Sequence, residues 1–446
     1  MYDAIFIEGK GTPTVTLAFE HFINDARSAA SSKGMPVVRV VPETIVSEST
    51  VVEDIEVAIT AVADDMVAAL TRPLTAEEKS PRPREPENPP RIIFKGNLEE
   101  VNRFFYQRGW TDGLPVIPPT EEAVAEMITG TDLPADYLVE ALEPRLGKAT
   151  VERIAVNAVM AGCLPTYMPL LIAGVQCLAD NPVSGMMAAS TGSFSPFWLV
   201  NGPISRDIHV ISSYGATSPG NIANATIGRA LGLITKNMRG VRKQIEDMGV
   251  FGNPGKYTWV AAENEEHSPW EPLHVERGFR KEDSTITLTF PQSFQQMIPF
   301  GTDDKGILAT VLGGVVPGRM GTFVLMLTPT HAKSFADRGW TKKAVKDYIV
   351  KNARAPEDFY TRLGLSFSGP FDRGMPPPSP EDPLAIFHPS PRDPDPVQIY
   401  VFGGFGSWMG FMQGGPPPVT RKAELPANWK QLVNKYKNIV PKYVMY

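Results

Sequence analysis

The sequence predicts a mixed α/β protein in two unequal parts: a small N-terminal Rossmann-like domain with a parallel sheet, and a large α+β domain. Strand-like and helix-like segments alternate through the first 71 residues. Six prolines then fall among charged residues between positions 72 and 91, which is typical of an extended linker. The remaining sequence contains both the alternation of apolar residues that is typical of strands and the three-to-four-residue spacing that is typical of helices. We therefore expect a Rossmann-like domain at 1–71, a proline-rich linker at 72–91 and the large domain, with the active site, at 92–446.

The first part is expected to follow a β-α-β-α order. The short apolar run 4–7 predicts a strand, and the apolar spacing over 17–32 predicts a helix that Gly34 ends. The β-branched run 37–41 predicts a strand buried on both faces, and 55–70 predicts a second helix. That order favours a small parallel sheet.

The second part mixes the two element types. Its expected elements are helices at 98–108, 121–128 and 342–351, two helical stretches within 151–179, and strands at 197–200, 258–263, 284–290, 307–312, 322–328 and 398–402. The proline-rich segment 369–396 is expected to be irregular.

Composition limits the functional classes. The net charge is −6 with mixed signs and no basic stripe, which argues against nucleic-acid binding. Two cysteines are too few for a secreted disulfide scaffold, and reduced thiols fit a cytoplasmic protein. The N-terminus lacks the pattern of a targeting segment, and the longest apolar stretch is too short for a membrane span.

Two motifs carry candidate catalytic side chains in the first half of the large domain. The turn 109–115 contains Asp112, which either caps its own turn or presents a carboxylate beside Trp110 at the mouth of a site. Cys163 lies where Pro165 must break a helix. Beside free backbone N–H groups its thiol would have a lowered pKa, although a plain buried cysteine is the commoner case. We interpret Cys177 as structural.

A candidate anion site lies before the helix expected at 223–233. Small residues lead into that helix, so backbone N–H groups and the helix dipole would favour an anion, and the absence of a phosphate-loop spacing favours a carboxylate. Asn221, Asn224 and Arg229 would add donors, although Arg229 could equally pair with a neighbouring carboxylate. Further substrate-binding candidates are Ser190, Thr191 and Asn201.

The densest polar cluster follows the strand expected at 258–263. Strand geometry places Glu263 and Glu265 on one face, as acid–base catalysis or metal binding requires, and His274 follows shortly after. The alternative is an acidic surface loop. The glycine-rich aromatic segment 403–412, with Trp408, would either fill a core or form the apolar wall of a ligand pocket.

Several of these motifs resemble a bacterial family of unknown function. They are the segments 109–115, 161–165, 223–230 and 263–270, which are similar to proteins linked to the UGSC-motif (selenocysteine/cysteine-Gly-Ser-Cys) selenoprotein-like group. The first domain more distantly resembles the selenoprotein subunits of glycine-reductase-type enzymes. The Cys-Gly-Ser-Cys element of the family would precede the strand expected at 4–7 and is not in this sequence. The resemblance therefore implies no redox role, and Cys163 is the one matched thiol.

Together these observations predict a cofactor-independent enzyme, a lyase or hydratase, for a small organic substrate with a polar or anionic end and an apolar body. No cofactor is expected, and the sequence leaves a metal open. A thiol-dependent reductase or transferase using Cys163, and a non-catalytic subunit of a hetero-oligomer, are the alternatives. We expect the chain to form a homo-oligomer, and assembly with a different partner chain is the alternative. We also expect the first domain to dock on the second, and Asp112, Asn224, Arg229 and Glu263 to converge on one pocket.

Overall fold

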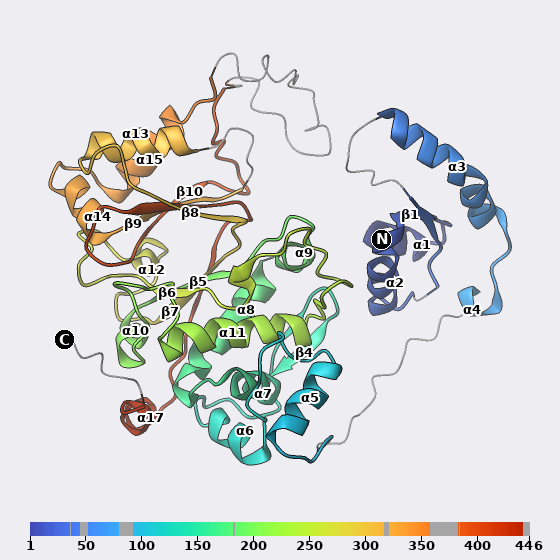
Figure 1. Cartoon of the computed structure of the whole chain (residues 1–446), viewed down its shortest axis with the longest axis horizontal. Helices are drawn as coiled ribbons and strands as arrows, with labels where there is room; N and C mark the ends of the chain where they lie inside the picture. Colours follow the sequence, from blue (N-terminus) through green and yellow to red (C-terminus); the bar gives the residue numbers. More distant parts are fainter. Residues whose placement is uncertain are drawn as a thin grey trace.

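The computed structural model describes residues 1–35, 37–44, 52–79, 92–181, 183–315, 321–356, 382 and 384–439. It is a mixed α/β structure, as predicted. In Figure 1 the N-terminal unit lies beside the larger part. No helix among the described residues is both long enough and apolar enough to cross a membrane.

The N-terminal unit is built on a two-stranded parallel sheet. Strand β1 pairs with β2, and helix α2 connects them. The elements are α1 (Tyr2–Glu8), β1 (Thr16–Phe19), the 3-10 turn η1 (Glu20–Phe22), α2 (Ile23–Ser32), β2 (Val40–Glu43), α3 (Val52–Thr71) and α4 (Ala76–Lys79).

Sequence reasoning misplaced the first elements of this unit. The strand expected at 4–7 is part of helix α1, because a four-residue apolar run fits a strand and a short helix equally well. The helix expected from 17 begins at Ile23, and its first residues form β1 instead. Helix α4 lies inside the expected linker, whose residues 80–91 fall outside the described ones.

The larger part has four layers, with helices outside two stacked sheets (Figure 1). One sheet has the order β12-β7-β5-β6 and the other β10-β9-β11-β8. Their strands are β5 (Phe197–Asn201), β6 (Val260–Ala262), β7 (Thr285–Thr289), β8 (Ser293–Met297), β9 (Phe323–Leu327), β10 (Val397–Val401), β11 (Met409–Gln413) and β12 (Val419–Lys422).

The two sheets share one plan and exchange their last strands. In each, a parallel pair (β5 with β6, β9 with β10) is followed by an antiparallel strand on the first member of the pair (β7, β11). The next strand then crosses to the other sheet: β8 pairs with β11, and β12 pairs with β7. Each sheet is therefore completed by a strand from the other half of the sequence.

Alternating side chains on these strands build three cores. Phe197 and Leu199 of β5 face the second sheet, whereas Trp198 and Val200 face the helices behind the first. Strand β9 follows the same rule with its own helices. Because both faces of β5 and β9 are covered, every residue of these two strands is buried, which is why sequence reasoning located them.

Helices cover the outer face of each sheet. Behind the first sheet lie α7 (Val151–Ala161), α8 (Met168–Asp180) and α11 (Ile222–Asn237), and behind the second lie α13 (Asp304–Gly314), α14 (Pro329–Ala336) and α15 (Lys342–Asn352). The remaining elements are α5 (Leu98–Gln107), α6 (Glu121–Ile128), β3 (Leu138–Leu142), β4 (Gly147–Thr150), η3 (Pro165–Tyr167), α9 (Ser184–Ala189), α10 (Pro203–Asp207), η4 (Pro254–Lys256), α12 (Leu273–Glu276) and α17 (Trp429–Tyr436).

The strand expected at 307–312 is wrong, because these residues belong to helix α13. Asp303 caps that helix by accepting a hydrogen bond from the backbone N–H of Gly306 at 2.8 Å. Ile307, Leu308 and Val311 are buried on one helical face. Of the irregular segment 369–396, residues 369–381 and 383 lie outside the described ones.

The first domain contacts the larger part, which confirms the expectation of docking. The Ser28 hydroxyl donates to Glu246 at 2.6 Å, and the Lys33 ammonium lies 3.1 Å from Glu143. The Asp25 carboxyl lies in this contact, where burial and the nearby Glu246 raise its pKa to about 6.

Candidate functional site

The turn 109–115 is built by two left-handed glycines after helix α5. Gly109 has a φ of 68° and Gly113 a φ of 94°, conformations that favour glycine. Between them, Asp112 Oδ1 accepts from the backbone N–H of Leu114 at 3.2 Å, so the carboxylate does cap its own turn. The same carboxylate also faces helix α11, and a role limited to capping the turn does not explain that contact.

Arg229 of α11 holds this turn through Asp112. Arg229 Nε donates to Oδ2 at 2.7 Å and Nη2 donates to Oδ1 at 3.0 Å, so the pair is bidentate. Nη2 also donates to the carbonyl of Pro115 at 2.7 Å. Both ionic side chains are 17% exposed. The pair is therefore held rigidly and remains reachable from solvent.

A cavity of about 370 Å³, here called the cationic cavity, opens beside this pair. Its buried apolar floor consists of Leu233, Val241 and Phe290. Its charged lining residues are Asp112, Arg229, Lys236, Lys243, Asp247 and Lys256. Arg229 is neutralised by Asp112 and Lys256 by Asp247 at 2.7 Å, so Lys236 and Lys243 form no ion pair among the residues described. The cavity thus combines an apolar floor with two unbalanced positive charges.

Among the residues that line this cavity, Lys236 is the one with a clearly shifted pKa. Its ammonium donates to the carbonyl of Thr111. Partial burial lowers the pKa of Lys236, and the nearby Asp112 opposes that change. An ammonium has three donors, so Lys236 keeps hydrogen-bonding capacity for a ligand.

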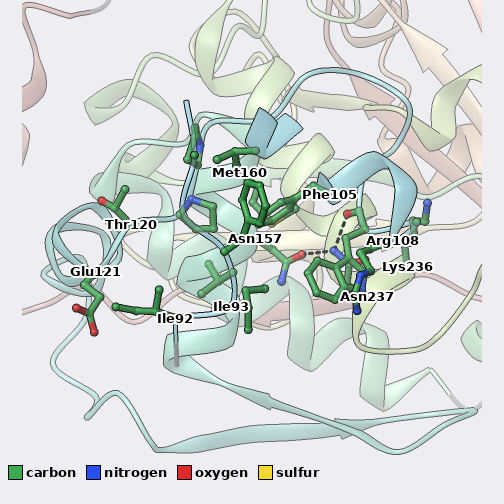
Figure 2. A pocket seen from close by; sticks show the side chains of 18 of the residues that line it. Ile92, Ile93, Phe105, Arg108, Thr120, Glu121, Asn157, Met160, Lys236 and Asn237 are labelled. Carbon is green, nitrogen blue, oxygen red and sulfur yellow. Dashed lines mark hydrogen bonds between the residues drawn. The ribbon is translucent and has the colours of Figure 1, made fainter. Parts of the chain in front are cut away.

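Lys236 also lines a larger cavity of about 1020 Å³, here called the large cavity. Figure 2 shows Lys236, Asn237 and Arg108 at one end and Thr120 and Glu121 at the other. Across its middle, Asn237 donates to the side chain of Asn157 at 2.8 Å. Lys236 is the lining residue that the two cavities share.

The expected convergence of four residues on one pocket is wrong. Asp112 and Arg229 meet, but Asn224 is turned into the protein, where its amide bonds Ile211, Ala216 and Val260. Asn221 caps α11 by accepting from the Asn224 backbone N–H at 3.0 Å. The side chains of both asparagines therefore form their hydrogen bonds with the protein backbone. We assign them a role in holding the start of α11 and the segments around it, in place of substrate binding.

Glu263 lies elsewhere, in a buried polar cluster between the sheets. The side chain of Asn201, at the end of β5, donates to Glu263 at 2.5 Å and to Glu265 at 3.1 Å, so the two carboxylates do share a face. His274 Nδ1 lies 3.8 Å from Glu265 Oε1. The Lys342 ammonium of α15 lies 3.5 Å from Glu263 and 3.1 Å from Glu276.

This cluster is enclosed and ionically paired. Glu263 is 2% exposed and His274 is fully buried, so the acidic surface loop is excluded as their environment. Burial acts to raise the pKa of Glu276, but Lys342 and Lys346 outweigh it and leave the pKa below its usual value. The arrangement ties helix α15 to the end of β6. It brings together three expected catalytic residues without placing any of them in the cationic cavity.

The remaining candidates are dispersed. Cys163 follows the left-handed Gly162 that ends α7, so it does lie at a helix break. Its sulfur donates to the carbonyl of Thr226 at 3.3 Å, and burial raises the pKa of the thiol to about 12, so the expected lowered pKa is wrong.

Ser190 closes its own turn by accepting from the Gly192 N–H at 3.0 Å, with Thr191 between them. Trp408 lines a third cavity. The described residues contain no group of three or more His, Cys, Asp or Glu side chains that could hold a metal ion.

Sequence reasoning missed Lys236 because it ended the helix too early. The expected helix stopped at 233, whereas α11 continues to Asn237. Arg229, Gly232, Leu233 and Lys236 follow an i, i+3, i+4, i+7 spacing and share one helical face. Extending that pattern by one turn is the signal that would have found Lys236.

Comparison with known proteins identifies no relative. No family model matches the chain, and no match is found among curated proteins or among solved structures.

Proposed function

We propose that the chain is an enzyme, a lyase or hydratase, that acts in the cationic cavity on a small organic anion with an apolar body. The observation that carries the proposal is Lys236, an amine of lowered pKa in a cavity with an apolar floor. The ammonium of Lys243, which forms no ion pair among the residues described, favours an anionic substrate group, and a carboxylate fits it.

The proposed chemistry uses Lys236 as the proton-transferring group. A lysine whose pKa is lowered loses its proton more readily, and its neutral amine can remove a proton from the carbon next to a carboxylate. The electron pair of the broken C–H bond then forms a double bond to the neighbouring carbon, whose C–O bond breaks. The leaving hydroxide takes up the proton that Lys236 removed and departs as water, which returns Lys236 to its neutral form. Arg229 holds Asp112 and so fixes the turn that accepts the Lys236 hydrogen bond.

The thiol alternative lacks a comparable observation. A thiol with a pKa of about 12 is protonated at neutral pH, whereas a nucleophilic cysteine needs the thiolate. Glu263, Glu265 and His274 are assigned to the buried cluster, and we propose no catalytic step for them. From the motifs alone we also propose that the chain is a cytoplasmic homo-oligomer related to the UGSC-like proteins, with a Rossmann-like first domain.

The test measures proton exchange on carbon. Small hydroxycarboxylates and their unsaturated counterparts, each with an apolar side chain, are incubated with the protein in D₂O and followed by proton NMR. We expect deuterium to enter next to the carboxylate for at least one compound. Lys236→Met should reduce that rate by about 100-fold or more, which is the usual contribution of a general base.

Lys343→Met is the matched control, because Lys343 is 81% exposed and pairs with Asp347 on the surface of α15. Its rate should equal that of the unsubstituted protein. Equal rates for Lys236→Met and Lys343→Met would disprove the role of Lys236. Failure of every compound to bind would disprove the substrate class.

A further inference from the structure

A third cavity, of about 310 Å³, lies at the carboxyl ends of the parallel strands β9 and β10. It is called the aromatic cavity here and shares no lining residue with the cationic cavity. In open sheets the carboxyl ends of parallel strands are where loops assemble ligand sites. The loop after β10, residues 403–408, forms much of its wall.

That loop is held in place by the protein. The backbone N–H of Gly403 donates to the Ser212 carbonyl at 2.8 Å, and the Thr328 hydroxyl donates to the Gly406 carbonyl at 3.0 Å. The Tyr214 hydroxyl donates to the Phe405 carbonyl at 3.0 Å. The Tyr214 ring lies against Gly404, since a Cβ at 404 would overlap its ring atoms. The wall is therefore preorganised, and glycine is required at 404.

The aromatic side chains around this cavity are exposed to a degree that core filling does not explain. Tyr214 is 68% exposed, Trp408 54%, Phe405 51% and Phe294 44%. By contrast Met409, on the adjoining strand β11, is buried. The segment 403–412 thus divides into a core strand and an open aromatic wall. Aromatic rings gathered on one surface mark a binding site more often than single exposed ones do.

The lining also defines the charge of the ligand. None of the described residues that line the cavity is charged, in contrast to the cationic cavity. The polar groups present are neutral: the Trp408 indole N–H, the hydroxyls of Thr217 and Ser218, and the Gln296 amide. Within the part of the chain that the structure describes, these side chains donate no hydrogen bond to protein. A charged ligand would lose its hydration here without gaining a partner.

We propose that the aromatic cavity binds a neutral, flat, ring-bearing small molecule with hydroxyl or carbonyl groups. Its rings stack on Tyr214 and Trp408, and its polar groups meet the free neutral donors. This site is independent of the function proposed for the cationic cavity.

The test compares 2-naphthol with 2-naphthoate, which share a ring system and differ in charge at pH 7. Binding is followed by ligand-detected NMR and calorimetry. We expect 2-naphthol to bind and 2-naphthoate to bind at least about tenfold more weakly. Trp408→Ala and Gly404→Ala should each lower the affinity for 2-naphthol by about tenfold. The first removes a ring, and the second displaces Tyr214.

Two controls separate the site from the rest of the molecule. Phe251→Ala removes an aromatic ring that is 98% exposed and does not line the cavity, so it should leave the affinity unchanged. Lys236→Met should also bind 2-naphthol normally, which keeps this result distinct from the fate of the proposed enzyme activity.

Four results would overturn the proposal. The first is an affinity for 2-naphthoate equal to that for 2-naphthol. The second is the absence of saturation up to about 1 mM 2-naphthol, and the third is an affinity that does not fall in the Trp408 and Gly404 variants. The fourth is a dimer, seen by sedimentation, that Trp408→Ala dissociates, because the aromatic wall would then be covered by a second copy of the chain.

Discussion

Removing Lys342 should destabilise the protein far more than removing the lysine next to it. The Lys342 ammonium is 9% exposed and lies 3.5 Å from Glu263, whose side chain is fully buried. Lys342→Met leaves that carboxylate in the interior without its cation. Breaking a buried pair on one side costs about 3–5 kcal/mol, because the remaining charge loses both water and partner. Lys343→Met cuts a pair whose side chains are 81% and 62% exposed, and should cost less than about 1 kcal/mol.

The assay is urea denaturation followed by circular dichroism, with the two variants compared at equal concentration. The double variant Glu263→Gln with Lys342→Met should recover most of the loss, because a glutamine oxygen can still accept from Asn201 and from the backbone N–H of Leu273. A Lys342→Met midpoint equal to that of Lys343→Met would refute the reasoning. So would a double variant no more stable than the single one.

Two further predictions concern groups with shifted pKa values. Iodoacetamide at pH 8 should leave Cys163 unmodified in the native protein and modify it after unfolding, because its pKa is about 12; a native adduct located by mass spectrometry would contradict this. The docked Asp25 holds its proton up to about pH 6, whereas a free carboxyl releases it near 3.8, so docking of the first domain should be strongest at low pH and weaken as pH rises towards 6. Small-angle scattering should show expansion over that interval and none in Asp25→Asn, and equal expansion in both would exclude Asp25 as the cause.

Five of the eight strands in the two stacked sheets, β5, β6, β7, β9 and β10, could be predicted, since every residue of these five is buried. Strand β7 shows why this works: all five of its residues are buried, and the run is bounded by polar sequence. Two short apolar runs without such context were wrongly predicted to be strands. Residues 4–7 and 307–312 are helical. In the second case Asp303 is a helix N-cap that the sequence already indicates, but the β-branched residues that follow it favoured a strand.

The site was harder to predict than the fold, because sequence motifs do not reveal which way a side chain points. Asp112 and Arg229 were both found, and their bidentate pair confirms that the two motifs meet. Asn224 was chosen as a donor to a ligand, yet its side chain donates to three backbone carbonyls. Glu263 belongs to a charged cluster, but its cation, Lys342, comes from α15, and no spacing in the sequence connects the two residues.

The exchange of the last strands bears on how this chain can fold during synthesis. When β7 leaves the ribosome, its outer edge is open, because the strand that covers it, β12, is the last strand to be made. The nascent sheet must therefore present an unpaired hydrogen-bonding edge while both halves are completed, a state prone to pairing with other chains. Neither the half with β5 to β8 nor the half with β9 to β12 closes its own sheet, so a protein cut after β8 should yield fragments that aggregate alone and become soluble when expressed together.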